Sequence, residues 1–251
     1  MYNKFLATCV IVANLCFWAE CGRVKRVVGG AEVECGTQPR VASLQNVSTH
    51  QHLCGAYILT PDFAITAAHC VRHPADQYEL QLRNFCSDPP TARVLETIVH
   101  DLYDKRSDAH DIAVLRISLH LDDVTWLDDD MLPVSFFGIS GECFIYGYGT
   151  EDPNSTETSK TLLAAKVNIA SLDYCTLILG PIAPNYNDGM MCAVGEGADS
   201  CQGDSGSPMI CNKEVQAISS YGQSCGVPYL PGVYTSVGAH LGWIKKVMAT
   251  R

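Results

Sequence analysis

The chain alternates short apolar runs with turn-forming residues, and this spacing limits its fold more than any other feature. Between Cys35 and about Val237 the runs recur roughly every ten residues, separated by Gly, Pro, Asn and Asp. Such spacing is typical of the strands of sandwiches and barrels. The clearest runs are Ala56–Leu59, Phe63–Thr66, Val94–Val99, Ile112–Ile117, Cys143–Tyr146, Leu162–Ile169, Pro208–Ile210, Val215–Ser219 and Gly232–Thr235. We therefore expect an all-β fold, which at 251 residues is either one domain or two smaller ones.

Two segments have helical periodicity instead. Near the C-terminus Val237, Leu241, Ile244 and Met248 recur at heptad-like spacing, which predicts an amphipathic helix that covers one side of a core. A shorter helix is predicted around 172–179.

The N-terminus has the pattern of a secretory signal peptide. Lys4 is followed by an apolar run from Phe5 to about Ala19 that Asn14 alone interrupts. The run is too short to span a membrane comfortably, and polar residues follow it. We expect residues 1–19 to be removed and the chain to be secreted to the extracellular space; the alternative is a core helix.

Cysteine usage agrees with export. The chain has 13 cysteines, far more than a cytosolic enzyme of this size normally carries. Cys9 and Cys16 leave with the signal peptide, Cys21 lies at the boundary, and the rest are expected to form disulfides. Asn46 and Asn154 begin N-glycosylation sequons, for which the alternative is ordinary surface polarity.

The charge pattern argues against two classes of partner. The net charge is −10, acidic runs occur at 122–123 and 128–130, and lysines and arginines are not clustered. Binding to nucleic acid or to an anionic membrane needs a basic patch, so neither is expected. The acidic runs are interpreted as solvated loops.

Three local patterns carry residues suited to catalysis. In Thr66-Ala-Ala-His69-Cys70 a short apolar strand runs into small residues and a histidine. Asp111 opens the apolar run Ile112–Leu115, where a buried carboxylate would need donors or a cation. In isolation, a surface or satisfied core histidine and a turn aspartate are the favoured explanations of these two patterns.

The third pattern is the most specific. In Cys201-Gln-Gly-Asp-Ser-Gly-Ser-Pro208 a serine lies among glycines, which permit a tight turn that exposes a hydroxyl and aligns backbone N–H groups. An ordinary Gly/Ser turn does not explain the aspartate beside Ser205 or the cysteine four residues before it.

Together the three patterns, in the chain order His, Asp, Ser, resemble the chymotrypsin/trypsin family of serine proteases over about residues 27–250. The resemblance implies two six-stranded antiparallel Greek-key barrels packed together, with a C-terminal helix. It makes Ser205 the nucleophile, His69 the general base and then acid, and Asp111 the residue that orients the imidazole. The N–H groups of Gly203 and Ser205 would form the oxyanion hole.

The resemblance also implies activation by cleavage between Arg26 and Val27. The new α-amino group of Val27 would fold inward and pair with Asp204, completing the oxyanion hole and the substrate pocket. Residues 20–26 are then a propeptide and 27–251 the protease domain. Because the junction is basic, the enzyme is expected to activate itself.

Substrate choice follows from the residue six before the nucleophile, which in the family lies at the base of the specificity pocket. Here it is Asp199, which would pair with a substrate Arg or Lys. Ser200, Gly222 and Gly232 complete the predicted substrate-binding set.

Departures from the family pattern affect subsites rather than chemistry. Ser207 stands where glycine is usual, Tyr221 replaces a frequent tryptophan, and Ser224 replaces a glycine. The loop 83–93 lacks the spaced glutamates of trypsin's calcium loop, so no metal and no other cofactor is expected.

By resemblance, four disulfides join Cys54 to Cys70, Cys143 to Cys211, Cys175 to Cys192 and Cys201 to Cys225. Cys35 and Cys86 remain, and we expect them to pair. Cys21 would be removed, tether the propeptide, or bond another chain.

The sequence thus predicts a secreted monomeric endopeptidase that cleaves after Arg or Lys and is controlled by protein protease inhibitors. Three rivals remain: a silent homologue that only binds, for which a triad residue should be lost; an esterase, for which the Gly-x-Ser-x-Gly elbow is absent; and a chymotrypsin-like pocket, which Asp199 opposes.

Overall fold

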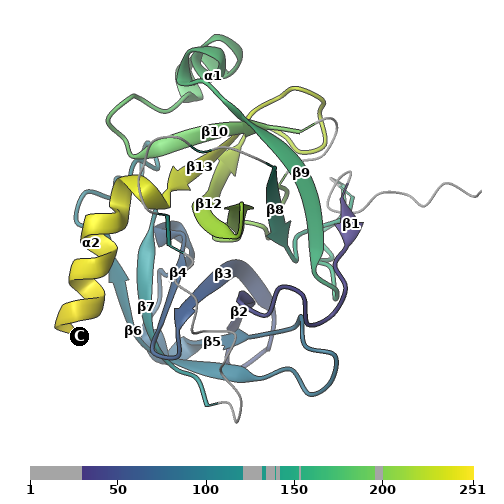
Figure 1. Cartoon of the computed structure of the whole chain (residues 1–251), viewed down its shortest axis with the longest axis vertical. Coiled ribbons are helices and arrows are strands. Elements are labelled where there is room, and N and C mark those ends of the chain that lie inside the picture. Colours follow the sequence, from purple (N-terminus) through teal and green to yellow (C-terminus); the bar gives the residue numbers. More distant parts are fainter. Residues whose placement is uncertain (1–29, 121–131, 134–138, 140–141, 153, 196–199) are drawn as a thin grey trace, which may run out of the picture.

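The computed structural model describes residues 30–120, 132–133, 139, 142–152, 154–195 and 200–251. The predicted signal peptide (1–19), the propeptide (20–26), Val27 and Asp199 lie outside the described residues. Figure 1 shows two β-barrels packed together, with helix α2 beside them.

The first barrel is formed by the N-terminal half of the chain. Its strands form a closed antiparallel ring in the order β2-β3-β4-β7-β6-β5. Leu44, Ile58, Ile65, Leu80 and Leu115 are fully buried and fill its interior. Closure pairs every strand on both sides, which removes the free edges that an open sheet would expose. The strands are β2 (Val41–Asn46), β3 (His52–Thr60), β4 (Phe63–Thr66), β5 (Tyr78–Gln81), β6 (Thr91–Val99) and β7 (Ala113–Ser118).

The second barrel is closed because β8 pairs with both β9 and β11. Along β9, buried Leu163, Ala165 and Val167 alternate with half-buried or exposed residues, as expected for a strand with one face on a core. The short strand β1 (Ala31–Glu32) adds to β9 from outside the ring. The ring strands are β8 (Cys143–Gly147), β9 (Leu163–Ala170), β10 (Met190–Val194), β11 (Pro208–Cys211), β12 (Glu214–Gly222) and β13 (Gly232–Ser236). The predicted architecture of two six-stranded antiparallel barrels with a C-terminal helix is confirmed.

Both predicted helices are present, each capped by a serine. α1 (Leu172–Leu179) begins after Ser171, whose Oγ accepts a hydrogen bond from the N–H of Tyr174 at 3.1 Å. α2 (Val237–Thr250) leaves β13 and runs alongside β6 and β7 (Figure 1), where Arg251 pairs with Glu96 of β6 at 3.1 Å. Short 3-10 helices occupy 68–70, 75–77 and 180–182. No helix in this part of the chain has the length and apolar character needed to cross a membrane.

The predicted buried face of α2 was only partly right. Val237 and Ile244 are buried as expected, and half-buried Met248 packs against the core; His240 and Val247 are also buried, whereas Leu241 is half-buried. A histidine takes a core position because both of its ring nitrogens have hydrogen-bond partners, which offsets the cost of burying them.

Candidate active site

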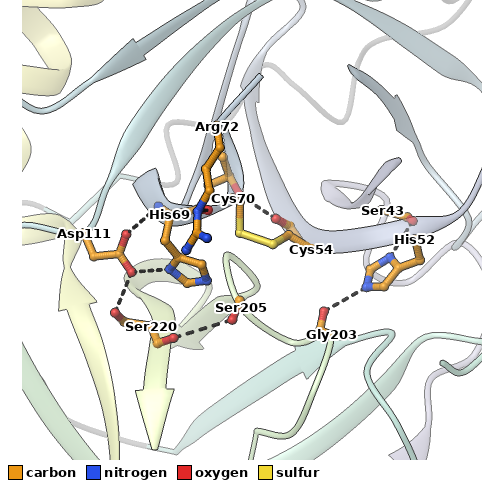
Figure 2. The surroundings of a disulfide bond; sticks show 12 residues. Ser43, His52, Cys54, His69, Cys70, Arg72, Asp111, Gly203, Ser205 and Ser220 are labelled. Atoms are coloured by element: carbon orange, nitrogen blue, oxygen red, sulfur yellow. Dashed lines mark hydrogen bonds and ion pairs between the residues drawn. A yellow bond between two sulfur atoms is a disulfide. The ribbon is translucent and has the colours of Figure 1, made fainter. Parts of the chain in front are cut away.

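His69 lies on the 3-10 turn Ala68–Cys70, directly after strand β4 of the first barrel. Ala67 and Ala68 are buried, so their small side chains let this turn approach the core closely. Cys70 is joined to Cys54 of β3 by a disulfide, which fixes the turn from its other side. The imidazole keeps 20% of its surface exposed and points toward Ser205 (Figure 2).

Asp111 is completely buried just before β7 and accepts hydrogen bonds from three donors. His69 donates from Nδ1 to Oδ2 at 2.7 Å and from its backbone N–H to Oδ1 at 2.9 Å. Ser220 Oγ donates to Oδ2 at 2.6 Å. These donors offset the cost of burying the carboxylate. Because a carboxylate only accepts, Nδ1 of His69 carries the proton and Nε2 is left with a free lone pair.

Ser205 comes from the second barrel, in the loop that precedes β11. Its hydroxyl donates a long 3.5 Å hydrogen bond to the carbonyl oxygen of Ser220. Figure 2 shows the ring of His69 directed toward Ser205, with Ser220 contacting both Asp111 and Ser205. The structure thus brings the three predicted catalytic residues together. Hydrogen bonds of this kind are often long without substrate and tighten when it binds.

The predicted oxyanion hole is held from two sides. Gly203 has a φ of 93°, which only glycine adopts readily. Nε2 of His52 donates to the carbonyl oxygen of Gly203 at 2.8 Å. The N–H of Gly55 donates to the carbonyl oxygen of Ser205, also at 2.8 Å. Within the described residues the N–H groups of Gly203 and Ser205 have no partner. They are therefore available for a negatively charged oxygen.

His52 is buried and hydrogen-bonded through both ring nitrogens. Its Nδ1 lies 2.7 Å from the hydroxyl of Ser43, while Nε2 binds Gly203. Burial lowers the pKa of His52 to about 4, against the smaller opposing effect of the Gly203 carbonyl. The ring is neutral at physiological pH, and its hydrogen bond to the carbonyl oxygen fixes the orientation of the Gly203 peptide.

The two barrels are in close contact near Ser205, where Gly55 meets Ser207. A Cβ atom on Gly55 of β3 would lie 2.7 Å from the Cα of Ser207, so only glycine fits there. Ser207, which replaces a usual glycine, is buried, and its hydroxyl has no hydrogen-bond partner among the residues described.

The side chain of Asp204 is buried in the second barrel. Its carboxylate accepts from the N–H groups of Gly149 and Cys201, each at 2.8 Å. Glycines at 147 and 149 leave room for it, since a Cβ at Gly149 would lie 2.5 Å from its carboxyl carbon. Burial raises the pKa of Asp204 to about 6, although both backbone hydrogen bonds lower it. In the part of the chain described, no cation pairs with it.

The predicted substrate-binding residues lie at one end of the second barrel. Gly222 of β12 pairs directly with Gly232 of β13, and neither residue has a side chain of its own to fill the space beside it. The hydroxyl of Ser200 lies 3.3 Å from that of Tyr234, and the disulfide Cys201–Cys225 ties the two sides together. Asp199 and the cleavage junction Arg26–Val27 lie outside the described residues.

Five disulfides are present, and they join the pairs expected from the sequence: Cys35–Cys86, Cys54–Cys70, Cys143–Cys211, Cys175–Cys192 and Cys201–Cys225. Both sequons are accessible, because Asn154 is exposed and Asn46 is half-buried at the end of β2.

Sequence reasoning missed His52, Ser220 and Thr235. Ser220 and Thr235 both donate to Asp111, the second through its hydroxyl to the Asp111 carbonyl at 2.8 Å. These residues lie inside or at the end of strands, where nothing local marks them. Only their contacts, from 109 to 151 positions along the chain, show what they position.

Comparisons with known proteins agree with this geometry. The Trypsin family model matches residues 27–244. Trypsin delta of Drosophila erecta is 31% identical over 88% of this chain and 88% of its own length. Human kallikrein-8 is 32% identical over 93% and 92%, respectively.

A solved structure of neuropsin, a serine protease expressed in the limbic system of mouse brain, aligns with a TM-score of 0.76 at 30% identity. The alignment covers 87% of this chain and 98% of that structure. The chain therefore belongs to the trypsin family of serine proteases and is a serine endopeptidase.

Proposed function

We propose that this endopeptidase is secreted, is activated by cleavage between Arg26 and Val27, and hydrolyses peptide bonds that follow Arg or Lys. The observation that carries the catalytic assignment is the linked set of contacts from Asp111 to His69 and, through Ser220, to Ser205. Export is supported by five disulfides and two accessible sequons, which fit an oxidising compartment.

Each triad residue has one chemical role in this proposal. Ser205 Oγ attacks the substrate carbonyl carbon while Nε2 of His69 removes its proton, and the imidazolium then protonates the leaving amine. Asp111 keeps the proton of the neutral ring on Nδ1 and stabilises the imidazolium. Water then hydrolyses the acyl-enzyme by the same proton transfers.

The oxyanion formed in each step would be bound by the N–H groups of Gly203 and Ser205. His52 supports this role because it holds the Gly203 carbonyl and so fixes the orientation of that peptide. Removing one oxyanion donor typically raises the barrier by about 3–4 kcal/mol.

Specificity for basic residues is inferred from Asp199, six positions before Ser205. The facing pair Gly222 and Gly232 supports the inference, because an open wall admits a long side chain. A carboxylate at the closed end would pair with guanidinium or ammonium.

Activation is inferred from the environment of Asp204. A buried carboxylate whose pKa is raised by burial is a favourable partner for a newly formed α-ammonium group. Cleavage after Arg26 would supply this group at Val27.

The specificity test compares Arg and Phe fluorogenic substrates on the chain cleaved after Arg26. Asp199→Ser should lower kcat/KM for the Arg substrate by a factor equivalent to about 2–5 kcal/mol, because one partner of a desolvated pair is lost. Ser205→Ala should remove hydrolysis of both. Asp76→Ser, on an exposed 3-10 turn, is the control and should change neither. Undiminished Arg hydrolysis by Asp199→Ser would disprove the specificity assignment.

A further inference from the structure

A second group of titratable side chains lies around His110, the residue before Asp111. His100 follows β6, His110 immediately precedes Asp111, and His240 lies in the first turn of α2. One nitrogen of each ring lies within 4.8 Å of one nitrogen of the other two. None of the three takes part in the proposed peptide hydrolysis.

The hydrogen bonds of His240 orient its ring for binding. Nδ1 lies 2.6 Å from the carbonyl oxygen of Ser236, so Nδ1 carries the proton and Nε2 presents a lone pair. Nε2 lies 2.9 Å from Nδ1 of His110, which donates to it when nothing else is bound. Metal-binding histidines are commonly fixed in this way, by a backbone carbonyl on the other nitrogen.

A glycine lets the backbone approach the two rings closely. A Cβ atom on Gly189 would lie 2.4 Å from Cε1 of His240 and 3.0 Å from Nδ1 of His110. Gly189 also has a φ of 67°, which suits glycine. The backbone there packs directly on the imidazole pair.

Ring contacts hold His100 beside the other two histidines. His100 stacks on His110 with their centroids 5.1 Å apart, and its edge contacts Trp243 at 4.7 Å. His240 is buried and the other two histidines are half-buried, which gives the group a path to solvent.

We propose that His100, His110 and His240 form a binding site for a divalent transition metal ion of the zinc class. Imidazole nitrogens favour Zn²⁺, Cu²⁺ and Ni²⁺ over Ca²⁺ and Mg²⁺, which need oxygen ligands. Tetrahedral zinc with bonds of about 2.0–2.1 Å places ligand nitrogens about 3.3 Å apart. The 2.9 Å pair therefore needs to open by only a few tenths of an ångström.

Binding needs a change of tautomer at His110 and a movement of the rings, because the three nitrogens lie within 4.8 Å of one another rather than at the spacing of about 3.3 Å that zinc requires. Its proton moves from Nδ1 to Nε2, and Nδ1 then gives its lone pair to the metal beside Nε2 of His240. Three protein ligands leave a fourth position for water. Among the described residues, Cys54, His69 and Cys70 form a second close group. These two cysteines form a disulfide and offer no thiolate to a metal.

The metal would slow peptide hydrolysis, a consequence that rests on the proposed role of Asp111. His110 has a φ of 53°, and its N–H donates to the carbonyl oxygen of Asp188 at 2.9 Å. Drawing its ring onto a metal strains a backbone that leads directly into Asp111. The carboxylate that orients His69 is then displaced.

Binding is tested without activity, on the whole disulfide-bonded chain carrying Ser205→Ala to prevent self-digestion. Co²⁺ is titrated at neutral pH and followed by the visible absorption of tetrahedral cobalt, then displaced by Zn²⁺. We expect one saturable site. His110→Asn, which tolerates positive φ, and His100→Asn should each weaken binding about tenfold or more. His120→Asn, an exposed histidine near the end of the first barrel, should not.

Two results would overturn the metal site. One is the absence of saturable binding. The other is a cobalt affinity in both cluster variants that equals the affinity of the parent protein, which would place the ion elsewhere, for example on His69. Thermal unfolding of each variant without metal shows that the fold is retained. His240→Gln serves as a third variant once it passes the same check.

Rate measurements on the cleaved enzyme test the coupling separately. Zn²⁺ should lower kcat in the wild type, chelator should restore it, and His100→Asn should need about tenfold more metal for the same fractional loss. Cobalt binding with no change in rate would disprove the coupling to Asp111. If no peptide is hydrolysed at all, the proposed function fails while the cobalt titration still decides the site.

Discussion

His52 and His240 show how burial changes what a histidine does. Each is held through both ring nitrogens, and burial lowers each pKa to about 4. Both rings are therefore neutral structural groups over most of the pH range. His69, with 20% of its surface exposed and one nitrogen free, is the ring left available for proton transfer.

We predict that His52 makes the folded protein sensitive to acid. Its folded-state pKa of about 4 lies below the ordinary value of 6.5. As the pH falls from 6.5 to 4 the unfolded chain binds a proton and the folded chain does not, so the free energy of unfolding decreases. The maximum slope is about 1.4 kcal/mol per pH unit. Urea unfolding of the Ser205→Ala protein at several pH values measures it.

His52→Gln should reduce that slope by up to about 1.4 kcal/mol per pH unit, the equivalent of one proton. The glutamine amide keeps a donor for the Gly203 carbonyl. His73→Gln, at an exposed position, is the matched control. Asp204 contributes with the opposite sign in the same pH range, but equally in all variants, so it cancels in the differences. An unchanged slope in His52→Gln would contradict the prediction.

Two disulfides of similar loop length join different elements, so comparing them distinguishes an effect on stability from an effect on activity. Cys54–Cys70 and Cys175–Cys192 span 16 and 17 positions, so loop closure gives them nearly equal stabilisation. The first joins β3 to the turn that carries His69. The second joins α1 to β10, away from the triad.

Replacing either pair by alanine should therefore lower the free energy of unfolding by about 3 kcal/mol. Only the Cys54–Cys70 variant should also lose kcat, because the turn that positions His69 is released. Urea unfolding and kcat with one peptide substrate measure both quantities. Equal losses of kcat in the two variants would show that the turn needs no disulfide.

For the whole molecule, we predict that cleavage after Arg26 stabilises the fold in a pH-dependent way. In the uncleaved chain Asp204 has a folded-state pKa of about 6, above its ordinary 3.8. The stability of this form therefore falls as the pH rises from 3.8 to 6, because the unfolded chain releases the proton first. In the cleaved chain the Val27 ammonium would pair with the carboxylate and prevent this loss.

Melting temperatures of cleaved and uncleaved Ser205→Ala protein should hence differ more at pH 7 than at pH 4. Asp204→Asn removes the charge and should abolish the pH dependence of the difference. A gap that is the same at both pH values would argue against insertion of the new terminus beside Asp204.

Local signals in the sequence predicted some elements of the fold and missed others. Strands such as Phe63–Thr66 and the helix at 172–179 were predicted correctly because periodicity and turn residues are local signals. Strand β5 (Tyr78–Gln81) gave no apolar run, since its partly exposed Glu79 and Gln81 alternate with buried residues over only four positions. On α2, the sequence could not show that a histidine would replace Leu241 on the buried face.

By itself the sequence determined the all-β class, the export signals and the residue types of the triad, because each depends on a local pattern or a short motif. Only the tertiary structure decided which neighbours hold them: Ser220 on Asp111, His52 on Gly203, and His100 and His110 beside His240. These contacts join residues from different strands and helices. Their energy depends on burial and on distances of about 3 Å, which no local pattern encodes.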